Sequence, residues 1–187
     1  GNLCFKPQYG YTESATDEDT GVKFLRITDI NKTPWVDWST VPYCKIEPED
    51  FKKYKVNVGD LLIARIADPG HSTIIENDIS AVFASYLIRF IPKKSKHQRY
   101  LQYWMRSKSY WNLVNSRMTG STRSNLNATV LKGFEIIQPT TDLIEIFDNI
   151  ISGLREIINN HLLEIISLRE IREILINENF IKGAKES

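Results

Sequence analysis

The sequence predicts an α+β protein, in which a mixed α/β domain is followed by a long C-terminal α-helix that forms a coiled coil. Three observations carry this prediction. Short apolar runs of strand length, separated by turn-forming residues, recur through the first 140 residues. Between residues 98 and 118 the apolar spacing changes to a helical period. In the segment 143–180 the apolar residues recur at intervals of seven in three parallel tracks.

Apolar runs define the strands of the first domain. The run LLIARI, residues 61–66, does not alternate with polar residues, so we expect it to be buried on both faces. The segment 81–91, AVFASYLIRFI, is the longest strand candidate and is closed by Pro92. Residues 1–21 are polar and rich in turn formers, which predicts a loop. The predicted strands cover residues 22–30, 61–66, 73–75, 81–91 and 133–138.

Helical segments are marked by caps and by a period near 3.6. Pro48 and the acidic residues after it suit a helix N-terminus, which predicts a short helix to Tyr54. Trp104 and Trp111 belong to one apolar stripe of the segment 98–118, and we assign both to core packing. The predicted helices cover residues 48–54, residues 98–118, a turn around Val130, and residues 143–180 with Thr141 or Asp142 as cap.

The long C-terminal helix is predicted to be an interaction device. Its apolar face is wide, and a helix over 143–180 would be about 50 Å long. The chain offers no second helix of comparable length, so we expect this helix to pair with a partner helix from outside the chain. His161 interrupts the apolar tracks, as a single polar residue that sets register in a coiled coil does. The expected dimerisation residues are Phe147, Ile151, Leu154, Ile158, His161, Ile165, Leu168 and Leu175.

Charge is distributed unevenly along a chain whose net charge is only +1. Residues 79–134 contain ten lysines and arginines and no aspartate or glutamate. Solvated surfaces normally mix the two signs, so this segment predicts a polyanionic partner such as nucleic acid. A basic outer face without a specific partner is the alternative interpretation.

The sequence contains few features that are typical of an enzyme. Cys4 and Cys44 are too few for a disulfide framework, which indicates a reducing, cytoplasmic location. The chain begins with no signal-like apolar run and contains no stretch of membrane-spanning length. It also lacks metal-ligand spacing, a phosphate-binding glycine loop and a flanked nucleophile. We therefore predict a non-catalytic protein with no metal and no cofactor of its own.

Three polar loops carry the residue types that read base edges and hold phosphates. They are residues 8–14, residues 65–72 and residues 119–125, and they are rich in Arg, Asn, Gln, Ser, Thr and aromatic side chains. Arginine pairs with guanine, asparagine or glutamine with adenine, and serine or threonine with either.

The order of several motifs resembles the specificity subunit of type I restriction-modification systems. These motifs are QYGYTESA, FLRITDI, VGDLLIARI, GSTRSNL, a strand that ends in Pro139, and the long helix that ends near Gly183. The likeness covers nearly the whole chain. It implies a DNA target-recognition domain at residues 1–140, a coiled-coil spacer and dimerisation helix at 141–182, and a tail at 183–187.

This resemblance implies a division of labour between proteins. In that family the specificity subunit binds double-stranded DNA and does no chemistry. Modification subunits carry S-adenosylmethionine and methylate adenine, and a restriction subunit cuts. The common member holds two recognition domains in tandem, joined by two antiparallel helices. One copy of each here implies a homodimer that reads an interrupted, inverted-repeat site and positions the modification subunits.

The resemblance also assigns candidate DNA-binding residues. The positions that match the recognition loops of the family are Arg65, Ser72, Ser121, Thr122, Arg123 and Asn125. Weaker candidates are Tyr9, Tyr11, Thr33 and Trp35, and Lys93, Lys94 and Lys96 are expected to contact phosphates. The competing hypothesis is a non-catalytic coiled-coil adaptor whose globular domain binds protein.

Overall fold

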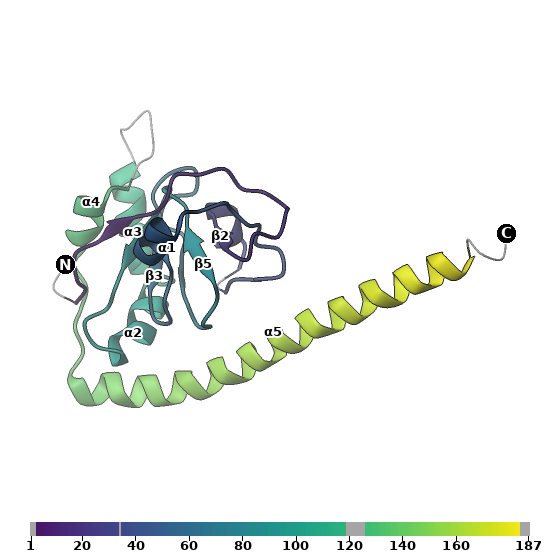
Figure 1. The fold of residues 1–187 in the computed structure, drawn as a ribbon. Helices are drawn as coiled ribbons and strands as arrows, with labels where there is room; N and C mark the ends of the chain where they lie inside the picture. Colours follow the sequence, from purple (N-terminus) through teal and green to yellow (C-terminus); the bar gives the residue numbers. More distant parts are fainter. Residues whose placement is uncertain (1–2, 34, 119–125, 184–187) are drawn as a thin grey trace. The chain divides into compact units, whose positions relative to one another are not determined.

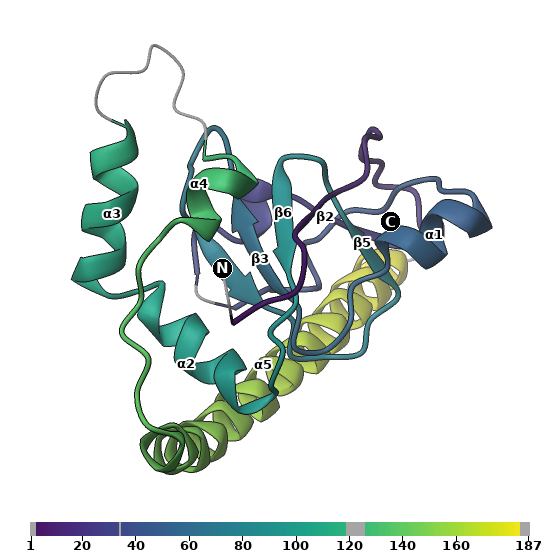
Figure 2. The same cartoon turned by 90° about the vertical axis from the view of Figure 1, so that its left-hand side faces the viewer.

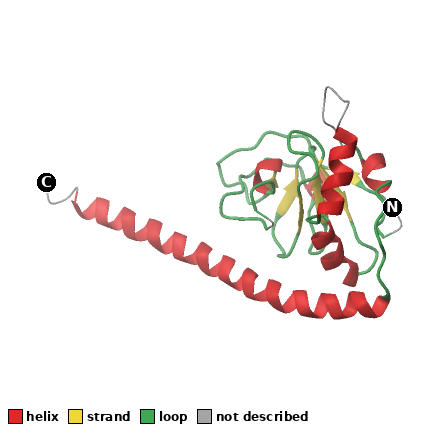
Figure 3. Ribbon diagram, turned by 180° about the vertical axis from the view of Figure 1, so that it is seen from behind, coloured by secondary structure: helices red, strands yellow, loops and turns green. Residues whose placement is uncertain are grey.

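The structure is a computed structural model that describes residues 3–33, 35–118 and 126–183, with side chains to residue 177 (Figure 1). The chain forms two compact units, Gly1–Asn149 and Ile150–Ser187, which are described separately. The first unit combines sheets and helices, and the second is helical (Figure 3). The α+β class predicted from the sequence is confirmed.

The strands are short and the last helix is long. The strands are β1 Gln8–Tyr9, β2 Lys23–Leu25, β3 Leu61–Ala64, β4 Ser72–Ile74, β5 Ala81–Phe83 and β6 Leu87–Phe90. The helices are the 3₁₀ turn η1 Ile27–Asp29, α1 Pro48–Tyr54, α2 Lys96–Trp104, α3 Lys108–Met118, α4 Ala128–Lys132 and α5 Thr141–Gly183. The predicted helices at 48–54, around Val130 and at the C-terminus are all present.

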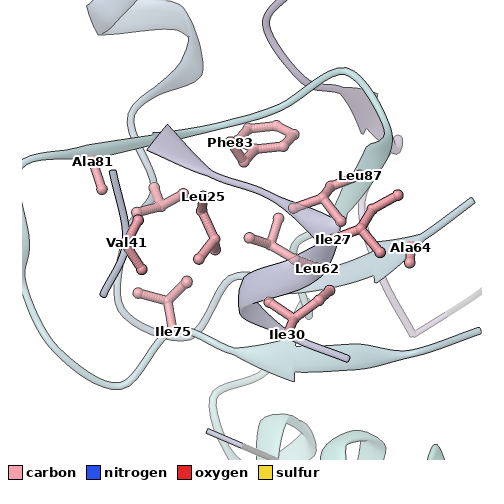
Figure 4. Packing of buried hydrophobic residues seen from close by; sticks show 11 residues of the cluster. Leu25, Ile27, Ile30, Val41, Leu62, Ala64, Ile75, Ala81, Phe83 and Leu87 are labelled. Carbon is pink, nitrogen blue, oxygen red and sulfur yellow. The ribbon is translucent and has the colours of Figure 1, made fainter. Parts of the chain in front are cut away.

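A four-stranded antiparallel sheet in the order β1-β6-β3-β4 lies at the centre of the first unit. Side chains alternate across a strand, so β3 contributes to two cores. Leu61 and Ile63 pack among α2, α3 and α4, whereas Leu62 and Ala64 face the other cluster, with Leu25 and Phe83 (Figure 4). Figure 2 shows these three helices on one side of the sheet, with β2 and β5 on the other. The prediction that this run is buried on both faces is confirmed.

The predicted strand 81–91 is two strands that belong to different sheets. β5 pairs in parallel with β2, and β6 pairs with β1 and β3. A turn at Ser85 and Tyr86 separates them, where the N–H of Leu87 donates to the carbonyl of Ala84 at 2.9 Å. Both strands are fully buried, so both are apolar in sequence. The apolar pattern therefore does not reveal where one strand ends and the next, in a different sheet, begins.

The predicted helix 98–118 is also divided. α2 ends at Trp104, and α3 begins at Lys108 after a tight corner. The hydroxyl oxygen of Ser107 accepts a hydrogen bond from the N–H of Tyr110 at 3.2 Å, as a helix-capping side chain does. Trp104 and Trp111 pack partly buried against the helical cluster, with Tyr110 edge-on to both rings. Their predicted core role is confirmed.

Other sequence expectations differ from the structure at element ends. The predicted strand 133–138 forms no strand in the described residues, and Phe134 and Ile136 pack against the helical cluster. The predicted strand 22–30 stops at Leu25, because the Asp29 carboxylate accepts from the N–H of Arg26 at 2.8 Å and closes η1. The predicted N-terminal loop contains β1, an edge strand too short to show an alternating pattern.

The helix α5 contains 43 residues, which corresponds to about 65 Å. Within the first unit its first turns are anchored, because Ile144 is buried and the Phe147 ring lies 5.7 Å from that of Tyr103. In the second unit many large apolar side chains are solvent-exposed. They include Leu154, Ile157, Ile165, Leu168, Ile171 and Leu175. Among the described residues, no helix is both long and apolar enough to cross a membrane.

A buried arginine connects several segments of the first unit. Arg89 of β6 donates to the Asp60 carboxylate at 3.0 Å, and both side chains are almost fully buried. The same guanidinium donates to the carbonyl oxygens of Lys55 and Lys53, at 2.6 and 3.2 Å, and to the side chain of Gln8. β6 is thereby tied to the edge strand β1, to the end of α1 and to the turn before β3.

We expect the substitution Asp60→Ala to lower the free energy of unfolding by about 3–5 kcal/mol, because it leaves the Arg89 charge buried without its partner. Urea unfolding followed by circular dichroism measures this. Asp78→Ala is the matched control, since Asp78 makes an exposed 3.4 Å ion pair with Lys55 and should cost less than about 1 kcal/mol. Equal losses for the two variants would contradict a central role of the buried pair.

Candidate nucleic-acid interface

Two of the predicted reading loops meet at one end of the four-stranded sheet. β3 ends opposite the start of β6, where Ala64 pairs with Leu87. Just beyond, the N–H of Arg65 donates to the carbonyl of Tyr86 at 3.0 Å. The N–H of Ser85 donates to the carbonyl of Tyr11 at 2.7 Å. The loops 8–14 and 65–72 and the β5–β6 turn therefore share one edge of the domain.

The residues that directly follow the third predicted loop lie at this domain edge. The loop residues Ser121, Thr122, Arg123 and Asn125 themselves lie outside the described part of the chain. The next residue, Leu126, donates its N–H to the carbonyl of Arg65 at 2.8 Å. The N–H of Ala128 donates to the Tyr9 hydroxyl at 3.2 Å. Segments far apart in the sequence are thus joined around Arg65 and Tyr9.

Arg65 and Tyr9 also contact each other directly. The guanidinium carbon of Arg65 lies 5.1 Å from the centroid of the Tyr9 ring, a cation–π distance. Tyr9 is 41% exposed, so its ring can contact a ligand as well as the arginine. The Arg65 Nε is buried and has no hydrogen-bond partner among the described residues.

The loop 65–72 is held in a defined conformation. Ala67 has φ +60°, a left-handed backbone that is strained for a residue other than glycine. Gly70 has φ +97°, and a Cβ there would lie 3.0 Å from Val114 of α3. The buried Tyr110 donates its hydroxyl to the Gly70 carbonyl at 2.7 Å, and the Asn31 amide donates to the Asp68 carboxylate at 2.5 Å. A loop fixed in this way presents its side chains without an ordering cost on binding.

The remaining predicted reading residues are placed differently. Ser72 opens β4 and is half-buried in the same hairpin. Tyr11 packs against the Tyr54 ring, at a centroid distance of 5.2 Å, and belongs to a core cluster. Trp35 is half-buried in the loop that follows η1, where its carbonyl accepts from the Thr33 hydroxyl at 2.6 Å. Tyr11 and Trp35 therefore expose less surface to a ligand than Tyr9 does.

The three predicted phosphate-binding lysines lie at the opposite end of the sheet. Lys93, Lys94 and Lys96 follow β6, whereas Arg65 and Tyr86 lie where β6 begins. Lys93 donates its N–H to the carbonyl of Leu3 at 2.9 Å, and its side chain is exposed. Lys96 forms an ion pair with Glu145 of α5. The structure therefore does not bring these lysines together with the reading loops.

The acid-free segment is partly neutralised by acids from elsewhere in the chain. Arg89 pairs with Asp60, Lys96 with Glu145, and Arg99 with Glu76. Among the other basic residues of the segment, those with described and exposed side chains are Lys93, Lys94, Lys108, Arg117 and Lys132. The surface charge is smaller than the sequence run indicates, because a run of one sign does not show which residues pair across the fold.

Tyr86 is a residue of this edge that sequence reasoning missed. It is 53% exposed and lies in the β5–β6 turn, next to the backbone of Arg65. It lies inside the apolar run 81–91, which the sequence predicts to be a single strand. The pair Ser85-Tyr86, a polar and an amphipathic residue within that run, is the available signal for a turn.

Burial shifts the pKa of several ionisable groups outside this edge. Burial raises the pKa of the Cys4 and Cys44 thiols to about 11, so both stay protonated at neutral pH. Burial lowers the pKa of His97, with a smaller contribution from Lys94, which keeps the imidazole neutral at pH 7. Burial also raises the pKa of Tyr110. No group of three or more His, Cys, Asp or Glu in the described residues could hold a metal ion.

Comparison with solved structures identifies the fold. A chain from a study of complex assembly and conformational transition of the type I R-M system superposes with a TM-score of 0.59 at 14% identity. The match covers 85% of this chain and 37% of that one. The type I restriction-modification S subunit from M. genitalium gives a TM-score of 0.57 at 13% identity, over 84% of this chain and 38% of that one. This chain thus spans less than half the length of either protein.

Sequence comparison identifies the family. No curated protein is a significant match to the chain. Residues 8–167 match the family described as "Type I restriction modification DNA specificity domain", whose members are non-catalytic. The match spans both the first unit, with its convergent polar loops, and the first part of α5. The chain belongs to the family of type I restriction-modification DNA specificity domains.

Proposed function

We propose that this chain is a half-length, homodimeric DNA specificity subunit of a type I restriction-modification system. The observation that supports homodimerisation is the row of exposed apolar side chains on the second unit. Leu154, Leu168 and Leu175 are 53%, 57% and 53% exposed, and Ile165 is 43% exposed. Exposed apolar surface of this extent marks an interaction site, and the seven-residue spacing matches a second helix.

Our proposed dimer seam consists of the eight dimerisation residues expected from the sequence. Phe147, Ile151 and Ile158 are partly buried in the single chain and would extend the exposed row. His161 is exposed, with its Nδ1 3.4 Å from the Glu164 carboxylate, and would set the register. Antiparallel pairing of two copies would place one recognition domain, residues 1–140, at each end of a spacer formed by residues 141–182.

The edge around Arg65 and Tyr9 would read DNA. Arginine pairs with guanine through two hydrogen bonds, and the other predicted reading residues, Ser72, Ser121, Thr122, Arg123 and Asn125, would supply further donors and acceptors. Lys93 and Lys94 would contact phosphates away from this edge, with Lys96 as a third if it leaves Glu145. Modification subunits carrying S-adenosylmethionine, and a restriction subunit, would complete the complex in the cytoplasm.

We expect methylation to occur at an interrupted inverted repeat. Two identical readers related by a two-fold axis must face two identical half-sites. Sequencing of methylated adenines in DNA from cells that carry the complete system returns the site and its symmetry. A continuous motif, or two half-sites of unrelated sequence, would contradict the homodimer proposal.

Deletion of one heptad, residues 162–168, should shorten the spacer between the half-sites by about three base pairs. Seven helical residues span about 10 Å, and DNA rises about 3.4 Å per base pair. Methylated-adenine sequencing measures the change, and the unchanged half-site sequence is the internal control. An unaltered spacer would show that α5 only dimerises the protein.

The substitution Arg65→Ala should relax base discrimination at one position of the half-site by about 1–3 kcal/mol. Competition binding with single-base variants of the site measures this loss. Lys93→Ala is the contrasting variant, which should weaken binding to all sequences alike. If Arg65→Ala also lowered affinity uniformly, the reading role of this side chain would be refuted.

A further inference from the structure

A groove of about 240 Å³ lies beside the loop 65–72. It is formed by three segments: the loop after η1, the start of β4, and the corner between α2 and α3. The volume far exceeds the roughly 10–15 Å³ that one water molecule requires. The groove can therefore admit a chemical group of a ligand, and its lining indicates which kind.

The groove lining combines positive charge with polar and apolar side chains. Lys32 and Arg106 contribute positive charge from different segments, and none of the described lining residues is Asp or Glu. Ser72 and His71 add a hydroxyl and an imidazole, which can each donate a hydrogen bond to an anion. The nearest carboxylate in the loop, Asp68, is bound by the Asn31 amide at 2.5 Å. The electrostatics favour an anionic ligand.

Ring contacts hold parts of this groove in place. The His71 ring lies edge-on to Trp111, with centroids 5.1 Å apart and planes at 66°. The Arg106 guanidinium carbon lies 5.3 Å from the centroid of the Tyr103 ring. The aromatic contacts orient the imidazole and the guanidinium before any ligand arrives, which lowers the entropic cost of binding.

We propose that this groove binds the phosphodiester backbone of the target DNA, with Lys32 and Arg106 as the phosphate contacts. The inference rests on the proposed DNA-reading function and adds a site to it. Ser72 and His71 belong to the same rigid hairpin as Arg65, so a phosphate held here would fix the position of the reading edge on the duplex. Phosphate contacts of this kind set register without reading sequence.

The test is the salt dependence of affinity for a duplex that contains the methylated site. Each phosphate contact contributes about 0.9 to the slope of log affinity against log salt. Lys32→Ala and Arg106→Gln should each lower that slope by about one, and the order of preference among single-base variants should not change. Between 50 and 200 mM salt, each variant should lose about 3.5-fold less affinity than the wild type loses.

Lys45→Ala is the matched control, because Lys45 is 77% exposed, pairs with Glu18 and does not line the groove. It should leave the slope unchanged. Thermal melting by circular dichroism checks that all variants fold, and the exposed Lys32 gives a test that does not depend on the ring contact of Arg106.

The outcomes separate this inference from the proposed function. A wild-type protein without salt-dependent binding to the duplex would overturn the proposed function itself. If the wild type binds with a steep slope that Lys32→Ala and Arg106→Gln both retain, only the groove inference fails. Calorimetry with inorganic phosphate alone tests a free anion as ligand. Tight phosphate binding that Arg106→Gln abolishes, with an unchanged DNA slope, would also overturn the groove inference.

Discussion

The buried cation at Arg89 is the constraint on which the arrangement of the first unit depends. A guanidinium has five donors and cannot lose its charge, so burial requires acceptors on several sides. The acceptors come from the Asp60 carboxylate, the Gln8 side chain and two carbonyls at the end of α1. The partial negative charge at a helix C-terminus favours a cation there. Because one side chain needs all these segments in place, it fixes β6 against β1, α1 and the turn before β3.

The fixed position of β6 also sets the arrangement of the polar loops that meet at the start of this strand. The register of β6 with β3 sets Tyr86 beside Arg65, and the turn there accepts the N-terminal segment through Tyr11. The hairpin that follows Arg65 is clamped by α3 through Tyr110 and by Asn31. A rigid scaffold with polar residues at one edge is the usual arrangement of a recognition surface, because ordered side chains lose less entropy on binding.

The fold decides which charged side chains of this protein pair with one another. The segment 79–134 has no carboxylate of its own, yet Asp60, Glu76 and Glu145 pair with three of its cations. The groove formed by Lys32, Arg106 and His71 shows the converse effect, because its two cations come from distant parts of the sequence. Sequence separation sets neither attraction nor repulsion between charges, since the interaction depends on distance in space and on the local dielectric.

The sequence by itself determined the elements whose signals are local. The heptad tracks define α5, Pro48 and its acids define α1, and the unbroken apolar run of β3 indicates burial on both faces. The motif order was sufficient to indicate the family, and the loops at 8–14, 65–72 and 119–125 were recognisable from composition. Only the tertiary structure decided that 81–91 splits between two sheets, that Tyr86 lies at the edge where the polar loops meet, and that Lys93 lies at the opposite end of the sheet. Strand pairing and salt bridges join residues distant in sequence, and apolar side chains look alike whichever sheet buries them.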